Sequence, residues 1–107
     1  ILPSVVFISG ERVSPGNIVH RFGHWLHVPA GAAADALARL AAGSRLEIRI
    51  EPDFVTESWR KLLINVTSNP LSALTTRRMG VFREPDLIPI ARALMLECAA
   101  VARAEGA

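Results

Sequence analysis

Three polar side chains recur at four-residue intervals in an otherwise apolar stretch of the chain: Lys61, Asn65 and Asn69. The spacing i, i+4 and i+8 would stack them along one face of an α-helix. Burying a cation and two amides among apolar side chains is costly unless each finds a polar partner. The row therefore faces either water or a polar ligand.

Lysine is an unusual choice of cation in this sequence, because Lys61 is the only lysine among 12 lysine and arginine residues. A guanidinium stays charged, whereas an ammonium whose pKa is shifted by its surroundings can give up and regain a proton. Lys61 is therefore a candidate for proton transfer, as an acid or as a base. The alternative is a solvated lysine on a helix surface, and the spacing alone leaves both interpretations open.

The residues around the row form a longer pattern: Trp59-Arg60-Lys61-Leu62, then Asn65, then Asn69-Pro70-Leu71-Ser72-Ala73. This pattern resembles the W-x-K-x-x-x-N-x-x-x-N-P-L-[ST]-A signature of the ketopantoate reductase (2-dehydropantoate 2-reductase) family. The resemblance implies that this helix opens the C-terminal domain of that family. It also implies that the chain is a middle fragment of a longer reductase.

The resemblance implies an activity and a role for each residue of the row. The parent enzyme would use NADPH to reduce 2-dehydropantoate, or a related 2-keto acid, to the 2-hydroxy acid. Lys61 would be the general acid that protonates the developing alkoxide, and Asn65 and Asn69 would bind substrate. Asn69 could instead cap the helix at Pro70, and Ser68 and Ser72 flank the same row.

The dinucleotide-binding fingerprint G-x-G-x-x-G does not occur in the 107 residues. We therefore expect NADPH to be bound mainly by parts of the parent protein outside this sequence, and the 107 residues alone to be inactive. The alternative function is a non-catalytic truncated module that self-associates through its apolar helices. On either interpretation we expect a homo-oligomer.

Composition narrows the class of protein. Half of the residues are hydrophobic and the mean hydropathy is +0.31, yet no apolar run approaches the ~20 residues of a membrane span. The net charge of +2 is too small to indicate nucleic-acid binding. One cysteine, Cys98, excludes an intrachain disulfide and predicts a reducing, cytoplasmic location. The start at Ile1, without a methionine or targeting segment, is what a fragment would show.

Three histidines, His20, His24 and His27, lie within eight residues and raise the possibility of a zinc site. If Gly23 separates two strands, His20 lies on a different strand from the other two. No cysteine is near them, and no carboxylate has the spacing of a ligand. We therefore predict no metal site.

The first half of the chain predicts a small, mostly antiparallel sheet with one short helix. β-branched and alternating residues predict strands at about 4–9, 17–22, 24–28 and 46–50. A Pro-Gly turn at 14–17 and a break at Gly23 would join the first three strands as a meander. Alanines between Gly31 and Gly43 predict the helix, with Gly43 at its C-terminal end.

The second half predicts two longer helices, which makes the fold class α+β. The first helix runs from about Phe54 to Asn69, where Pro70 should kink or break it before helix continues to about Arg77. Residues 78–83 form a connection, and Pro85 starts the last helix. We place the domain boundary after Pro52: residues 1–52 would end the nucleotide-binding domain, and 53–107 would begin the helical substrate domain.

Overall fold

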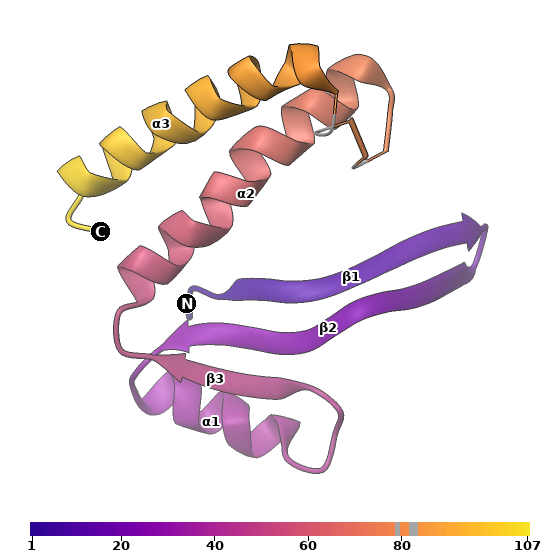
Figure 1. Cartoon of the computed structure of the whole chain (residues 1–107). Helices are drawn as coiled ribbons and strands as arrows, with labels where there is room; N and C mark the ends of the chain where they lie inside the picture. The colour runs from indigo at the N-terminus through magenta and orange to yellow at the C-terminus, as the bar shows by residue number, and fades with distance from the viewer. Residues whose placement is uncertain (79, 82–83) are drawn as a thin grey trace. The chain divides into compact units, whose positions relative to one another are not determined.

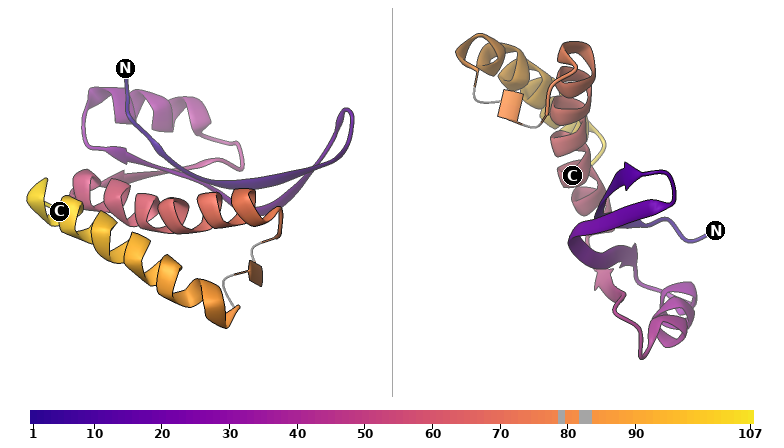
Figure 2. Two further views of the ribbon diagram at one scale, coloured as in Figure 1. Left: turned by 90° about the horizontal axis from the view of Figure 1, so that it is seen from above. Right: turned by 90° about the vertical axis from the view of Figure 1, so that its right-hand side faces the viewer.

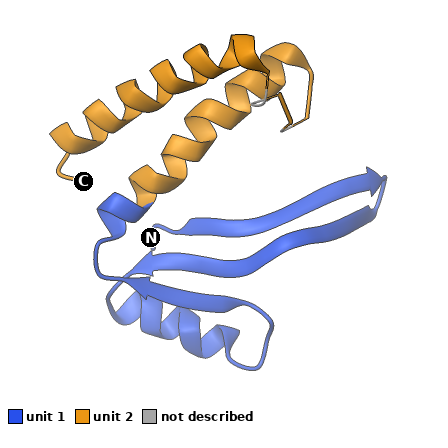
Figure 3. Ribbon diagram, viewed as in Figure 1, with its two compact units in different colours: residues 1–57 blue, residues 58–107 orange. Residues whose placement is uncertain are grey.

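The computed structural model describes residues 1–78, 80–81 and 84–107. These residues form two compact units, 1–57 and 58–107 (Figure 3). Three strands and one short helix precede two longer helices along the chain, which confirms the α+β class. Within the expected connection at 78–83, Met79, Phe82 and Arg83 lie outside the described residues.

Strands β1 (Val5–Ser14) and β2 (Asn17–Pro29) form an antiparallel hairpin (Figure 1). The predicted turn at Pro15 and Gly16 is confirmed, and Gly16 adopts the positive φ of 77° that glycine tolerates best. Both strands are longer than predicted, because pairing continues through residues 10–14 up to the turn.

The predicted strand break at Gly23 is wrong, because β2 is continuous through it. The register moves from Phe7 opposite Trp25 to Ser9 opposite Phe22, so two residues of β2 face one residue of β1. This is a β-bulge, and the φ of 72° at Gly23 accommodates it. A Cβ at Gly23 would lie 2.0 Å from the Phe7 carbonyl oxygen, so the close approach of the strands requires glycine.

The third strand, β3 (Glu47–Glu51), pairs in parallel with β2, and the strand order is β1-β2-β3. The sheet is therefore mixed. The predicted three-strand antiparallel meander is wrong, because the strands expected at 17–22 and 24–28 are the single strand β2. Parallel neighbours require a crossover, which α1 (Ala32–Ala41) provides while running alongside β3 (Figure 1, Figure 2). As predicted, Gly43 follows this helix, with a φ of 81°.

Helix α2 (Phe54–Thr75) is preceded by Asp53, which caps its first turn. The Oδ1 atom of Asp53 accepts a hydrogen bond from the Thr56 amide at 3.1 Å. The helix then continues through Pro70, so a break at that position is wrong. Proline inside a helix costs roughly 3 kcal/mol because one backbone hydrogen bond is lost. Burial of Thr67, Ser68 and Leu71 on both sides of Pro70 offsets this cost through packing.

The last helix starts at Pro85 as predicted, although its first turn is a 3-10 turn, η2 (Pro85–Leu87), that leads into α3 (Ile88–Ala104). Cys98 and Ala102 are the buried residues of this helix. Across the described ranges, none of the helices has the length and apolarity that a membrane crossing requires.

Candidate functional site

The polar row of Lys61, Asn65 and Asn69 lies within α2, which is one uninterrupted helix over these positions. Successive members are therefore about 6 Å apart along the helix axis and share one face. Lys61 and Asn65 are half-buried, and Asn69 is exposed. The structure thus gives the row the helical spacing expected from the sequence, while the role of each residue stays a prediction.

Two serines adjoin the row and differ in their hydrogen bonding. The Ser68 hydroxyl donates to Asn69 Oδ1 at 3.3 Å, which ties one oxygen of the row to its own helix. The Ser72 hydroxyl is buried and finds no hydrogen-bond partner among the described residues. A buried hydroxyl without a partner costs free energy, so Ser72 is a further polar group that a ligand could satisfy.

The three histidines of β2 have separate environments. His20 contacts the Gly23 carbonyl oxygen through its Nε2 atom and so bridges the bulge. His24 is exposed, and its Nε2 lies 3.9 Å from Glu47 Oε2. Because β2 is continuous, all three histidines lie on one strand, contrary to the arrangement considered from the sequence. The described residues contain no group of three ligating side chains that could hold a metal ion.

His27 occupies the most buried polar position of the sheet, and sequence reasoning considered it only as one of three possible zinc ligands. Its Nδ1 atom lies 3.1 Å from Glu51 Oε1 and 2.9 Å from Glu57 Oε1. The side chains of His27 and Glu57 are 11% and 14% exposed, against 30% for Glu51. The sequence showed only that His27 lies in a strand of β-branched and aromatic residues. That context does not indicate which carboxylates would contact its side chain.

The face of the sheet that carries His27 is lined by rings and charges. Phe7 stacks on Trp25 with ring centroids 5.9 Å apart, and the Phe7 ring lies 4.6 Å from the His27 ring. The Arg49 guanidinium lies over the Trp25 ring at 4.5 Å, a cation–π arrangement. Arg49 pairs with His27 across the strands, so the same face connects the ring cluster to the charged groups.

The ion pair between Glu47 and Arg49 of β3 shifts the pKa of both partners. Arg49 donates two hydrogen bonds of 2.9 Å to the two carboxylate oxygens of Glu47. These bonds lower the pKa of the Glu47 carboxyl and raise that of the Arg49 guanidinium, because each charge stabilises the other. Both groups are exposed to solvent, so the pair orders the strand surface more than it stabilises the fold.

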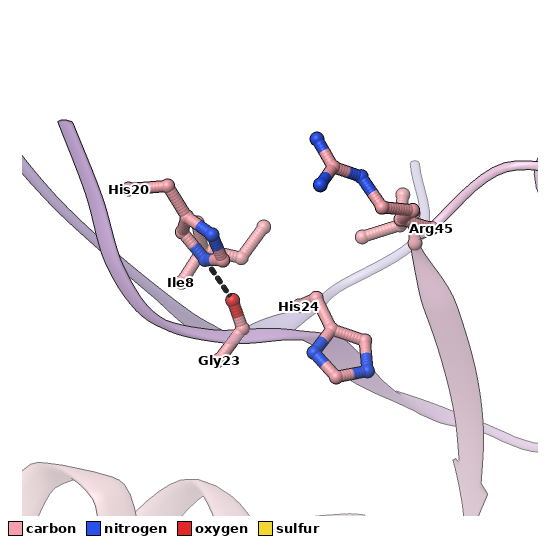
Figure 4. Close-up of a pocket in the computed structure, with 6 residues that line it drawn as sticks. Ile8, His20, Gly23, His24 and Arg45 are labelled. Atoms are coloured by element: carbon pink, nitrogen blue, oxygen red, sulfur yellow. Dashed lines mark hydrogen bonds between the residues drawn. The ribbon is translucent and has the colours of Figure 1, made fainter. Parts of the chain in front are cut away.

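A cavity of about 450 Å³ opens beside the bulge (Figure 4). Its lining combines two histidines and an arginine with apolar and backbone groups. In Figure 4 the His20 ring is turned toward the Gly23 carbonyl, so this imidazole is already engaged by the strand. The cavity is lined by Ile8, His20, Gly23, His24, Arg45 and Leu46.

Comparison with known proteins identifies the helical half of the chain. Residues 53–107 match the family model described as "Ketopantoate reductase PanE/ApbA C terminal", and this range includes the whole polar row. The chain belongs to the ketopantoate reductase family. The resemblance expected from the Trp59–Ala73 pattern is thereby confirmed.

Curated members of the ketopantoate reductase family match the whole chain. The 2-dehydropantoate 2-reductase of Caulobacter vibrioides is 39% identical over all 107 residues, which cover 37% of that protein. The enzyme of the same name from Mycobacterium tuberculosis is also 39% identical over the whole chain, which covers 36% of its length. The chain therefore spans little more than a third of the length of these relatives.

Solved structures of the family have a similar fold. A structure described as the dimeric ketopantoate reductase of Staphylococcus aureus matches 97% of this chain and 39% of its own, with 27% identity and a TM-score of 0.83. A PanE/ApbA family ketopantoate reductase of Ralstonia eutropha JMP134 matches 96% of this chain and 35% of its own, with 31% identity and a TM-score of 0.80.

Proposed function

We propose that this chain is part of an NADPH-dependent reductase that converts 2-dehydropantoate, or a related 2-keto acid, to the 2-hydroxy acid. One observation carries the proposal: Lys61, Asn65 and Asn69 lie along one uninterrupted helix inside the segment that matches the family model. The matching relatives named 2-dehydropantoate 2-reductase support the choice of substrate class.

In this proposal Lys61 is the general acid. The substrate carbonyl oxygen accepts a hydrogen bond from the Lys61 ammonium, which stabilises the negative charge that develops as the C2 carbon is reduced. The ammonium then transfers a proton to that oxygen and gives the hydroxyl of the product. An ammonium suits this task better than a guanidinium, whose proton is held too tightly.

The amides of Asn65 and Asn69 would orient the substrate along the helix. An amide donates and accepts hydrogen bonds without changing charge, which suits the hydroxyl and carboxylate groups of a 2-keto acid. Asn69 already accepts a hydrogen bond from Ser68, so Asn65 has the larger share of this role. The buried hydroxyl of Ser72 lies on the next turn and could add a further contact.

NADPH would supply the hydride when bound. The 107 residues contain no G-x-G-x-x-G sequence, and we assign none of them to the cofactor. We propose that residues 1–52 end the nucleotide-binding domain and that residues 53–107 begin the helical substrate domain. We further propose a cytoplasmic homo-oligomer, since Cys98 has no partner for an intrachain disulfide and the Staphylococcus aureus relative is described as dimeric.

A non-catalytic module that self-associates is the second candidate. Its support is the number of exposed apolar side chains on the two long helices, several of them about half exposed or more. Such surface is costly in water and favours association with another apolar surface. These residues are Leu62, Ile64, Leu74, Ile88, Leu96 and Val101.

The deciding experiment measures NADPH oxidation with 2-dehydropantoate by the complete reading frame that encodes this chain. We expect activity in the wild type and a loss of at least about 100-fold in kcat for Lys61→Ala, the lower end of what a general acid contributes. Arg92→Ala, which removes an exposed cation from α3, is the matched control and should leave kcat unchanged.

The two candidate functions give different results in this assay. A wild-type protein that binds NADPH but reduces no 2-keto acid would contradict the reductase proposal. If that inactive protein also forms a dimer that Leu74→Glu dissociates, the self-associating module is the better description, because Leu74 is 83% exposed in the described structure.

A further inference from the structure

Three ionisable side chains from three elements meet within residues 1–57. His27 comes from β2, Glu51 ends β3 and Glu57 lies in the first turn of α2. The shorter contact, 2.9 Å, joins His27 Nδ1 to Glu57 Oε1, and both of these side chains are nearly buried. Charged groups that are buried to this extent persist only when they are paired.

The two carboxylates converge on a single atom of the imidazole. Both carboxylates approach the same nitrogen of His27, and neither is aligned with it as a hydrogen bond. In its protonated form His27 would offset two carboxylates that otherwise face each other. Arg49, which pairs with His27 across the strands, places a second cation near Glu51.

The contact between His27 and Glu57 joins the central strand of the sheet to the first turn of α2. His27 lies in the central strand, paired with Val5 on one side and Arg49 on the other, and the Phe7 ring packs against its imidazole. Glu57 lies in the turn that Asp53 caps: the Glu57 amide donates to the Asp53 carbonyl oxygen at 3.2 Å. The first turn of α2 is thus held by both its cap and the His27 ion pair.

Glu57 precedes Lys61 by four residues in the same helix, so the two side chains share one helix face. We propose that His27 and Glu57 are positioning residues for Lys61: their ion pair fixes the first turn of α2 and thereby the placement of the lysine one turn later. This inference rests on the proposed role of Lys61 as general acid. A misplacement of about 1 Å can cost up to about 100-fold in rate.

The test uses the complete reading frame with His27→Gln, Glu57→Gln and the double variant. We expect each single variant to lower kcat by about 10- to 100-fold and to leave KM for 2-dehydropantoate within about 2-fold, because placement of the acid changes and substrate binding does not. The double variant should be no slower than the slower single variant, since both remove the same contact.

Two controls separate positioning from general stability. Glu47→Gln removes an exposed carboxylate from β3 outside the cluster and should leave kcat unchanged. Amide hydrogen exchange of residues 54–61 should become about 10-fold faster in Glu57→Gln, while exchange in β1 and β2 stays at the wild-type rate. Because Glu57→Gln keeps the size of the side chain, it decides the question even if His27→Gln fails to fold.

Failure of this inference is distinguishable from failure of the proposed function. An active wild type that is disabled by Lys61→Ala, but whose kcat is unaffected by Glu57→Gln, overturns the positioning role and leaves the general acid in place. Unchanged amide exchange in residues 54–61 overturns it as well. A wild type without reductase activity overturns the proposed function and with it this role.

Discussion

The sheet and α2 use polar side chains in opposite ways. In residues 1–57, charged groups from different elements meet one another, as His27, Glu51 and Glu57 do. On α2, the polar groups Lys61, Asn65 and Asn69 follow one another along a single helix. Contacts between elements fix a fold, whereas a row on one helix presents a set of groups to whatever lies beside it. Polar groups that meet across elements therefore indicate structure, whereas we propose that the row on α2 serves recognition.

Among the substitutions that test this comparison, we expect the largest effect on activity at Lys61. Lys61→Arg keeps the positive charge but holds its proton too tightly to act as an acid, so kcat should fall by about 100-fold or more. The free energy of unfolding should change by less than about 0.5 kcal/mol, because Lys61 is only half-buried and the substitution keeps its positive charge. Steady-state kinetics and urea unfolding of the complete reading frame measure the two quantities. A substantial loss of stability would place Lys61 with the structural polar groups instead.

In the sheet, Gly23→Ala should destabilise the fold without a direct effect on the chemistry. The new Cβ would lie 2.0 Å from the Phe7 carbonyl oxygen, and the residue has a φ of 72°, so we expect a loss of about 2–4 kcal/mol. Gly43→Ala is the matched control, because Gly43 has a similar φ of 81° but no atom within 4 Å of the new Cβ. It should cost about 1 kcal/mol. Equal losses in urea unfolding would show that the bulge contact is unimportant.

The two asparagines of the row should differ in their effect on substrate binding. Asn65→Ala should raise KM for the 2-keto acid by about 10-fold, the value of one hydrogen bond. Asn69→Ala should raise it by about 3-fold, because the Asn69 amide is exposed and partly engaged by Ser68. KM values from initial rates test this order. The reverse order would assign the main contact to Asn69 and shift the site toward Pro70.

The smallest effect is expected at Glu47, whose pKa is lowered by Arg49. A lowered pKa in the folded state means that ionised Glu47 stabilises the fold at pH values above the unfolded pKa, near 4.5. Glu47→Gln should therefore reduce Tm slightly at pH 7, and the difference should vanish as the pH falls through the lowered pKa of Glu47. Thermal unfolding at several pH values measures it. A difference that persists in acid would have a cause other than this ion pair.

Local sequence signals predicted the elements with clear boundaries. Gly43 follows α1 and the Pro-Gly pair turns the hairpin, each through the conformation of one or two residues. The row on α2 followed from helical spacing alone. Two predictions failed because the same residue type is compatible with two local structures. Gly23 forms a bulge within a continuous strand rather than a break between two strands. Pro70 lies inside a continuous helix, because the burial of its neighbours offsets the cost of the proline.

The contacts of His27 could not be predicted, because they depend on which strands pair. The parallel placement of β3 brings Glu51 to the end of the sheet that holds His27, and the following turn brings Glu57 there as well. Neither carboxylate lies near His27 in the sequence. Pairing between distant strands is decided by packing over the whole sheet, and no short pattern of residues encodes it.

The short third strand has a practical consequence for the hairpin. β3 pairs with Trp25–Pro29, so among the described residues β1 and β2 continue without a third strand beyond the bulge to the turn at Pro15 and Gly16. A Cβ at Gly16 would have no atom within 4 Å. Exposed turns of this kind tolerate inserted sequence. A fluorescent or affinity peptide placed after Gly16 would therefore mark the protein at a point separated along both strands from His27 and its carboxylates.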